Sequence, residues 1–286
     1  MRLMLQYLLP HKIISIIARL CANCKIVWVK NYLISDFLTR YNVNMQEAIE
    51  TNPLAYDCYN SFFTRELKAE LRPIDAGSNS VVSPADGLIA QIGNIQQQNI
   101  IQAKGHNYSV LDLLGGDTIN AANFNNGSFA TIYLAPHDYH RVHMPLTGRL
   151  TQMQYIPGKL FSVNTHAAEN IPNLFARNER VVTMYETNAG KMAVILVGAM
   201  IVGSIETIWA GTICPPHFTS INTWQYENND FQHIEIAKGA EMGRFKLGST
   251  VIVLFEQNSV VWEQTARING LVKIGQKIGN FSNRRI

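Results

Sequence analysis

From Val81 onward the chain consists of short β-rich runs separated by turn residues, and this pattern constrains the fold more than any other feature. The runs are rich in β-branched and aromatic residues, and they are too short and too regularly interrupted for long helices. They cover residues 87–93, 128–135, 149–156, 180–186, 192–202 and 250–255. Because no long strand–helix alternation and no internal repeat accompanies them, we expect a mainly antiparallel β-rich body.

The first part of the chain has a helical pattern instead. At 100° per residue, one apolar face collects Ile13, Ile16, Ile17, Leu20, Cys24 and Val27. Lys12, Arg19 and Lys30 line one margin of this face, and Lys25 lies near the other. An apolar stripe edged by cations is typical of a helix that lies in a membrane interface. It is equally typical of a helix packed on the protein's own core with solvated charges.

These textures predict an α+β protein with two regions. Residues 1–60 form a helical region, and residues 61–286 form a β-rich body. The formal net charge of +3 is uneven, because residues 1–40 carry six cations against Asp36 alone. The remaining chain is therefore slightly acidic, which argues against nucleic-acid binding and indicates an anionic partner for the first segment.

Targeting and redox signals are weak. The longest uncharged apolar stretch, residues 192–205, is too short to span a membrane and fits core strands better. The N-terminus lacks a small-residue cleavage site, so we expect it to be retained. Cys21 and Cys24 have C-x-x-C spacing without a second pair, and we interpret them as small apolar residues of a helix in a reducing compartment.

Three polar clusters interrupt the apolar runs: SPADG at 83–87, HDYHRVH at 137–143, and the Gly248-Ser249 step before the run 250–255. The residues alone leave several functions open. His137, His140, His143 and Asp86 could ligate a metal, as in a hydrolase, although no H-E-x-x-H occurs. Ser249 could be the nucleophile of a hydrolase, although no G-x-S-x-G elbow occurs. The Gly-Ser step could also be a simple turn in a non-enzymatic, membrane-associated β-domain.

A set of motifs in fixed order distinguishes these alternatives. They are FFTRELK at 62–68, RPID at 72–75, SPADG at 83–87, YHRVHMP at 139–145, LFSVN at 160–164, NLFARNERV at 173–181, VGAMIVGSIET at 197–207 and LGST at 247–250. Together they resemble the bacterial type of phosphatidylserine decarboxylase over nearly the whole chain. LGST alone is weak evidence, but the ordered set is very specific.

The resemblance implies self-cleavage between Gly248 and Ser249. The serine hydroxyl attacks the glycine carbonyl to give an ester, and β-elimination with loss of ammonia leaves a pyruvoyl group. Residues 1–248 would become the β chain and residues 249–286 the α chain. The pyruvoyl carbonyl would form a Schiff base with phosphatidylserine, which loses CO₂ to give phosphatidylethanolamine. No metal is implied.

The resemblance also suggests roles for individual residues. His143 would be the base for Ser249, with Asp86 fixing the imidazole tautomer. His140 would act in the decarboxylation, for which an unperturbed histidine pKa is suitable, and Ser162 would lie near the head group. His137 receives no role.

The roles of the two regions, the partners and the location follow from the same resemblance. It implies that residues 1–60 are a membrane-associating region and that residues 61–286 are the catalytic domain. We expect the two fragments to stay together as a heterodimer that dimerises further. The enzyme would sit peripherally on the anionic cytoplasmic face of the bacterial cell membrane.

Overall fold

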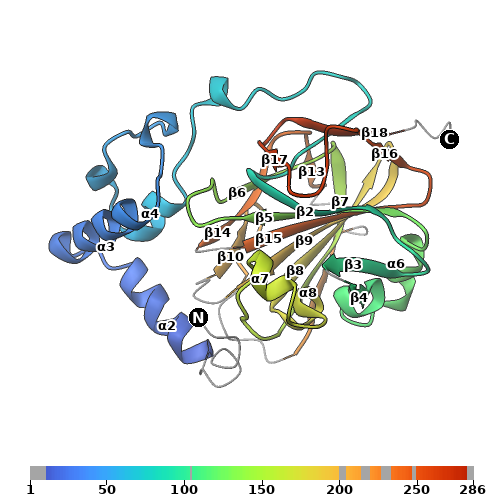
Figure 1. Ribbon diagram of the computed structural model, residues 1–286, viewed down its shortest axis with the longest axis horizontal. Coiled ribbons are helices and arrows are strands. Elements are labelled where there is room, and N and C mark those ends of the chain that lie inside the picture. The colour runs from blue at the N-terminus through green and yellow to red at the C-terminus, as the bar shows by residue number, and fades with distance from the viewer. Residues whose placement is uncertain are drawn as a thin grey trace.

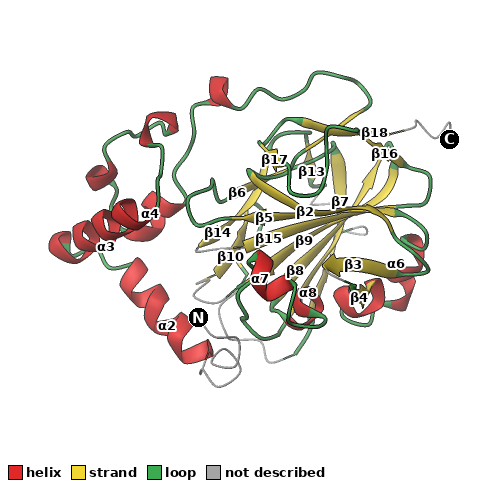
Figure 2. Ribbon diagram, viewed as in Figure 1, coloured by secondary structure: helices red, strands yellow, loops and turns green. Residues whose placement is uncertain are grey.

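The computed structural model describes residues 11–103, 105–199, 204–213, 220–226, 233–246 and 249–281. A group of helices at the N-terminal end stands beside a body built of strands (Figures 1 and 2). The described part of the body contains one large sheet and three smaller ones, and every pairing between its described strands is antiparallel. The predicted α+β fold class is confirmed.

From residue 11 onward, where the description begins, the helical region contains three α-helices and three short 3₁₀ helices. They are α2 (His11–Ala22), α3 (Val27–Arg40), η1 (Met45–Glu47), η2 (Pro53–Ala55), α4 (Tyr59–Phe63) and η3 (Ala69–Leu71). An aromatic cluster holds α3 against α4, because the Phe37 ring makes edge-on contacts with Tyr59, Phe62 and Phe63. Such edge-to-face pairs stabilise the fold beyond the free energy gained by burying the rings.

The single helix expected over residues 12–30 is wrong. Residues 23–26 separate α2 from α3, so Val27 and Lys30 belong to a second helix with its own direction. Lys30 is also not a solvated margin cation. It is 8% exposed, and its ammonium donates to the Leu54 carbonyl at 2.7 Å. Lys12 is the second residue of α2, but its side chain lies outside the described part.

The central sheet has the strand order β12-β7-β8-β9-β15-β5-β2-β17, with β13 also pairing with β7. Its strands are β2 (Gly87–Asn94), β5 (Ser128–Leu134), β7 (Gly148–Ile156), β8 (Arg180–Thr187), β9 (Gly190–Gly198), β12 (Asn222–Gln225), β13 (Glu235–Ile236), β15 (Ser249–Phe255) and β17 (Leu271–Val272). All six predicted strands are therefore confirmed, with small shifts at their ends. The predicted run 192–202 ends earlier, at Gly198.

Strand β15 occupies the middle of this sheet, and all seven of its residues are buried. Val251, Val253 and Phe255 contribute to the core on one face, whereas Ile252 and Leu254 contribute to the core on the other. This two-sided burial explains why the strand reads as a continuous apolar run instead of an alternating one.

Smaller elements cover both faces of the central sheet. One core includes residues of the small sheets β11-β10-β14-β6 and β1-β18-β16. The other core includes residues of the β3-β4 hairpin and of four short helices. The bounds are β1 (Ser80–Val82), β3 (Asn99–Ala103), β4 (His106–Ser109), β6 (Arg141–His143), β10 (Ser204–Thr207), β11 (Gly211–Thr212), β14 (Glu241–Lys246), β16 (Val260–Trp262), β18 (Lys277–Phe281), α5 (Val110–Leu113), α6 (Thr118–Asn123), α7 (Thr165–Ala168) and α8 (Leu174–Arg177).

The end of α4 attaches the helical region to the loop between β5 and β6. The Phe63 ring stacks on His140 with centroids 4.1 Å apart, and Arg141 donates to the Thr64 carbonyl. Arg65 donates to the carbonyl of His137. The FFTRELK segment therefore lies directly against the histidine-rich loop.

Candidate active site at one end of the central sheet

Strand register brings the three polar clusters to the same end of the sheet. Ser249 begins β15 and pairs with Leu134, where β5 ends, and with Gly198, where β9 ends. Strand β2 begins at Gly87 on the other side of β5. The strands β9, β15, β5 and β2 are consecutive neighbours in the sheet. SPADG, the histidine loop after β5 and the start of β15 therefore lie at the same end of these strands.

Gly87 permits this close arrangement. A Cβ atom at this position would lie 2.3 Å from the Tyr133 carbonyl oxygen, so a larger residue would push β2 away from β5. The preceding turn is held by the Ser83 hydroxyl, which donates to the Ala85 carbonyl at 2.8 Å. SPADG therefore forms a tight bend directly before β2.

Ser249 is fully buried, and its hydroxyl oxygen finds no hydrogen-bond partner among the described residues. A buried hydroxyl without a partner is costly and needs a structural or functional reason. Gly248 lies outside the described residues, as does Leu247, so the geometry of the predicted cleavage bond is not described.

One ring nitrogen of His143 is hydrogen-bonded, and the other has no hydrogen-bond partner among the described residues. Its Nδ1–H donates to the Gly239 carbonyl at 2.7 Å, whereas Nε2 is buried without a partner in the described part of the chain. Burial lowers the pKa of His143, although this carbonyl contact and the charges of Glu241 and Asp86 oppose the shift. The ring is therefore neutral near pH 7, with the lone pair on Nε2 available to accept a proton.

Gly239 can present its carbonyl because of an unusual backbone angle. Its φ is +78°, in the left-handed region that glycine adopts without strain. A Cβ atom here would also lie only 2.7 Å from the Ile74 side chain. In this structure, therefore, Gly239 and not Asp86 sets the tautomer of His143.

His140 is more deeply buried and is held differently. Its Nε2–H donates to the Ala135 carbonyl at 3.1 Å, next to the Ser249 partner Leu134, and Nδ1 has no partner among the described residues. Burial, and then the charge of Arg65, lower the pKa of His140 to about 3. The expectation that His140 titrates near neutrality is wrong for this state, because the apolar surroundings disfavour the cation.

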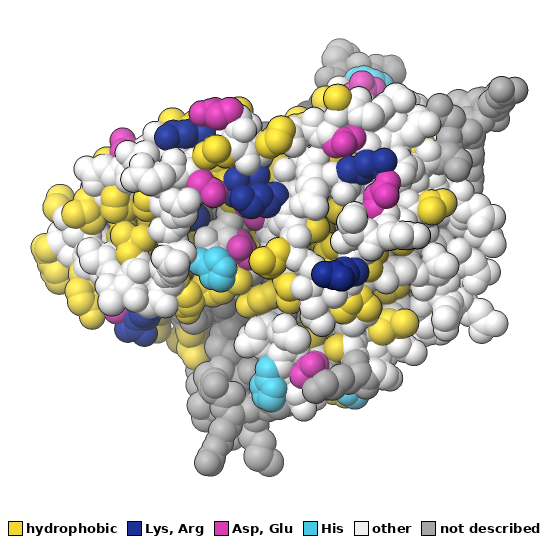
Figure 3. Space-filling model, turned by 45° about the horizontal axis from the view of Figure 1, so that its top comes forward, with side chains coloured by type: hydrophobic (Ala, Val, Ile, Leu, Met, Phe, Trp, Pro, Cys, Tyr) yellow, Lys and Arg dark blue, Asp and Glu magenta, His cyan; other side chains and the backbone are white. Residues whose placement is uncertain are grey.

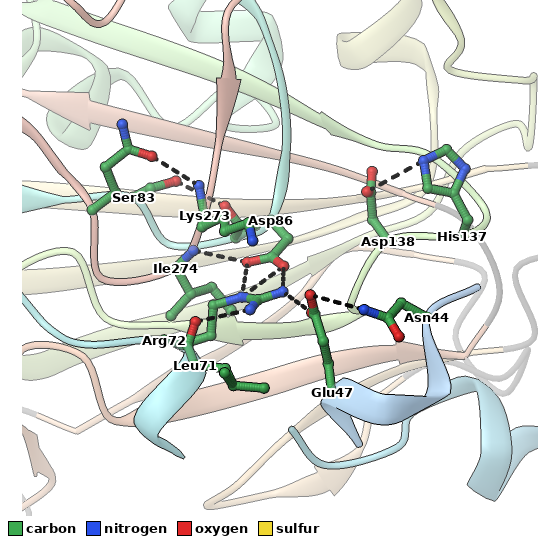
Figure 4. A network of polar contacts seen from close by, with 12 residues as sticks. Asn44, Glu47, Leu71, Arg72, Ser83, Asp86, His137, Asp138, Lys273 and Ile274 are labelled. Carbon is green, nitrogen blue, oxygen red and sulfur yellow. Dashed lines mark hydrogen bonds and ion pairs between the residues drawn. The ribbon is translucent and has the colours of Figure 1, made fainter. Parts of the chain in front are cut away.

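Asp86 accepts four hydrogen bonds (Figure 4). Arg72 Nε contacts both carboxylate oxygens, at 3.1 and 2.9 Å, and Nη2 contacts Oδ2 at 2.6 Å. The backbone N–H of Ile274 donates to Oδ1 at 2.8 Å. Asp86 and Arg72 line a cavity of about 210 Å³, to which Glu47, Arg65 and other residues of both regions contribute.

Ser162 lies in the loop after β7 and is half-buried. Asn178 ties this loop to the site, because its Nδ2 donates to the carbonyls of Phe161 and Gly198, both at 2.9 Å. Gly198 is the register partner of Ser249. The structure therefore links Ser162 to Ser249 through one buried amide side chain.

The histidines do not form a metal centre in the described part of the chain, where no group of three or more His, Cys, Asp or Glu side chains could hold an ion. His137 is half-exposed and faces Asp138, with 3.6 Å between Nε2 and Oδ1. His140 and His143 each contact a backbone carbonyl instead of converging with His137.

Sequence reasoning missed Arg72, Asn178 and Gly239. The first two stand inside motifs that were quoted, RPID and NLFARNERV, but the motifs gave no sign of what these side chains contact. Their partners lie in other elements: Arg72 contacts Asp86 14 positions away, and the His143–Gly239 contact spans 96 positions. Only the fold reveals such pairs.

Comparison with known families gives two matches. The family model described as "Phosphatidylserine decarboxylase" matches residues 59–280. A second family model, described as "PSD", matches residues 1–42.

Curated relatives match over almost the full length. A protein of Azotobacter vinelandii is 52% identical over 277 residues, which are 97% of this chain and 96% of the relative. Proteins of Ectopseudomonas mendocina and Pseudomonas fluorescens are also 52% identical, each over 96% of this chain and over 96% and 95% of the relative. All three are named phosphatidylserine decarboxylase proenzyme.

Proposed function

We propose a two-stage route for the reaction of this chain, which belongs to the phosphatidylserine decarboxylase family. It is the proenzyme of a carboxy-lyase of phosphatidylethanolamine synthesis, and its pyruvoyl group comes from its own chain by self-cleavage. The residues that perform each stage are our proposal. The observation that carries it is the register of Ser249 with Leu134, which brings Ser249, SPADG and the histidine loop to one end of the sheet.

In the first stage, Ser249 attacks the carbonyl carbon of Gly248. His143 Nε2 takes the hydroxyl proton, and Asp86 stabilises the imidazolium that forms. The acyl group moves from nitrogen to oxygen, which gives an ester and frees the amine of residue 249. Loss of the α-proton then expels the Gly248 carboxylate, and water releases the nitrogen as ammonia. One peptide bond and one water thus give a carboxylate, ammonia and a pyruvoyl group.

The buried end of β15 suits the group that replaces Ser249. The Ser249 hydroxyl has no partner among the described residues, and the backbone is held between β5 and β9 on both sides. A pyruvoyl group supplies an electrophilic carbonyl that binds an amine and withdraws electrons while CO₂ leaves. Gly198 and Leu134 would hold it in place through the strand.

In the second stage, we assign the return of a proton to His140 and the positioning of the head group to Ser162. His140 has a free Nδ1 in the described structure, and the Ser162 loop is tied to Gly198 through Asn178. Because the pKa of His140 is low before cleavage, this role requires that its surroundings change once Ser249 has reacted.

We further propose that α2 docks the enzyme on an anionic membrane surface, where phosphatidylserine resides. The side chains of Ile13, Ile17 and Leu20 are more than half exposed, as is Trp28 at the start of α3. Hydrophobic side chains gather over the helical region (Figure 3). This pattern supports peripheral attachment to a membrane. The cytoplasmic face and a further dimerised heterodimer are part of the proposal on the family resemblance alone.

No described helix combines the length and the apolar character needed to span a bilayer.

Variants of the two histidines test the stages separately. His143→Ala and Asp86→Asn should remain uncut over the time in which the wild-type chain is cleaved completely, because Ser249 would lack its assisted proton acceptor. His140→Ala should be cut but should decarboxylate about 10²–10⁴-fold more slowly, the usual cost of losing a general acid–base group. His106→Ala, on β4 away from the site, is the control. An uncut His140→Ala chain together with a cut His143→Ala chain would reverse the two roles.

A further inference from the structure

Arg72 lies between two carboxylates and is almost enclosed by them. Its Nη2 contacts Asp86 Oδ2 and Glu47 Oε2, both at 2.6 Å, and its Nη1 donates to the Leu71 carbonyl. The side chains of Arg72 and Asp86 are 10% and 9% exposed. Figure 4 shows the guanidinium group between the carboxylates of Asp86 and Glu47. This geometry differs from that of a surface ion pair, which is solvated and contributes little to protein stability.

The contacts from Arg72 Nε and Nη2 restrain the position of the Asp86 carboxylate. A planar guanidinium group holds a carboxylate in one orientation, which an ammonium group cannot do. A buried carboxylate without such a partner would lose favourable solvation without compensation. Ile274 N–H alone would remain to hold Asp86 if Arg72 were removed.

The loop that carries Asp86 contacts His143, the proposed base. The backbone N–H of His143 donates to the Pro84 carbonyl at 2.8 Å, so the SPADG loop lies directly beside β6. The charge of Asp86 also acts on the His143 ring, where it raises the pKa against the effect of burial. A shift of the Asp86 carboxylate would therefore change the field at His143.

We propose that Arg72 is a positioning residue for self-cleavage, which holds the Asp86 carboxylate where it stabilises the His143 imidazolium. This inference rests on the proposed roles of Asp86 and His143. Arg72 touches neither Ser249 nor His143 in the described contacts, so its effect passes through Asp86. Glu47 holds the other side of the guanidinium and connects it to η1 of the helical region.

The alternative is that Arg72 serves only to join the helical region to the body. In that case its loss would lower stability and slow cleavage to the same extent whether or not Asp86 is present. If Arg72 acts through Asp86, its loss has no further effect on cleavage once Asp86 is gone. A double-mutant cycle separates these cases.

The experiment follows cleavage of freshly made precursor. Radiolabelled full-length chains are synthesised in a cell-free system, and uncut chain is measured against time on a denaturing gel. Arg72→Gln should slow cleavage by about 10–100-fold, the usual cost of removing an outer partner of a functional group. Arg72→Lys, which keeps the charge but not the fork, should recover part of the rate. Asp86→Asn and the double variant Arg72→Gln/Asp86→Asn should cleave equally slowly.

Two controls accompany these variants. Arg149→Gln removes another arginine–carboxylate pair, with Glu186 on the neighbouring strand, and should cleave at the wild-type rate. Thermal unfolding in the Ser249→Ala background shows whether Arg72→Gln still folds. The inference is overturned if Arg72→Gln cleaves at the wild-type rate, or if it slows Asp86→Asn further by the same factor. A normal rate for Asp86→Asn would instead refute the proposed role of Asp86, and the inference with it.

Discussion

His140 and His143 lie three residues apart, and their rings are both enclosed, yet their contacts prepare them for different events. His143 keeps Nε2 free because Gly239 holds Nδ1, which is the arrangement that a base for Ser249 needs. His140 stacks on Phe63 in surroundings that exclude its cation. One residue type within one motif thus has two environments, and these environments come from segments far away in the sequence.

The low pKa of His140 makes stability depend on pH. The pKa rises from about 3 in the folded chain to its ordinary value of 6.5 in the unfolded chain, so below pH 6.5 protons favour unfolding. Each pH unit below 6.5 lowers the free energy of unfolding by about 1.4 kcal/mol, so the total loss at pH 5 is about 2 kcal/mol. This stability is complete above pH 6.5 and is lost as the pH falls toward 3.

We expect this effect to appear in thermal unfolding of the uncut Ser249→Ala chain. Between pH 7 and pH 5 its Tm should fall by about 4–8 °C more than that of the same chain with His140→Gln. His106→Gln is the matched control and should keep the full pH dependence. Equal slopes for the His140→Gln and parent chains would show that His140 is not buried as a neutral ring.

At the scale of elements, the sequence predicts the secondary-structure elements that are long and have a periodic apolar pattern. The six predicted runs of the body became strands because they are rich in apolar and β-branched residues, and all but β2 are buried along most of their length. Strands of two or three residues, such as β6 and β16, have no period to detect and exist because distant strands pair with them. The apolar period of residues 12–30 continues through the non-helical residues 23–26. The sequence pattern therefore did not reveal that α2 and α3 are separate helices.

The same limit applies to the candidate site. The motifs indicated Ser249, His143, His140 and Asp86, because chemistry-bearing residues are recognisable by type and order. They could not indicate that Arg72 holds Asp86, because a contact between segments depends on packing and not on local pattern.

The helix α2 should bind membranes through its exposed apolar side chains. Replacing Ile17 and Leu20 by Ser should weaken recovery on anionic vesicles, because each side chain contributes about 1–2 kcal/mol when it leaves water. Cleavage at residue 249 should be unaffected. The control is Ile119→Ser on α6, a side chain that is 80% exposed on the body. Equal losses for the control, or no loss for the α2 variant, would return α2 to the core-packing interpretation.

At the scale of the whole molecule, the proposed cut falls in a place that the fold can survive. The segment from residue 249 contains β15, in the middle of the central sheet, and β17 and β18, which pair with β2 and β1. Separating it would expose a fully buried strand on both faces and both edges. The two chains should therefore remain one folded particle after the peptide bond is broken.

The mass of the purified wild-type protein under denaturing conditions tests the central claim most directly. We predict two chains, residues 1–248 and a 38-residue chain from 249 to 286, the smaller one lighter by one ammonia than a serine-headed peptide. The smaller chain should react with a hydrazine reagent, and Ser249→Ala should give one inactive chain of 286 residues. A wild-type protein that decarboxylates phosphatidylserine as one intact chain would contradict this account.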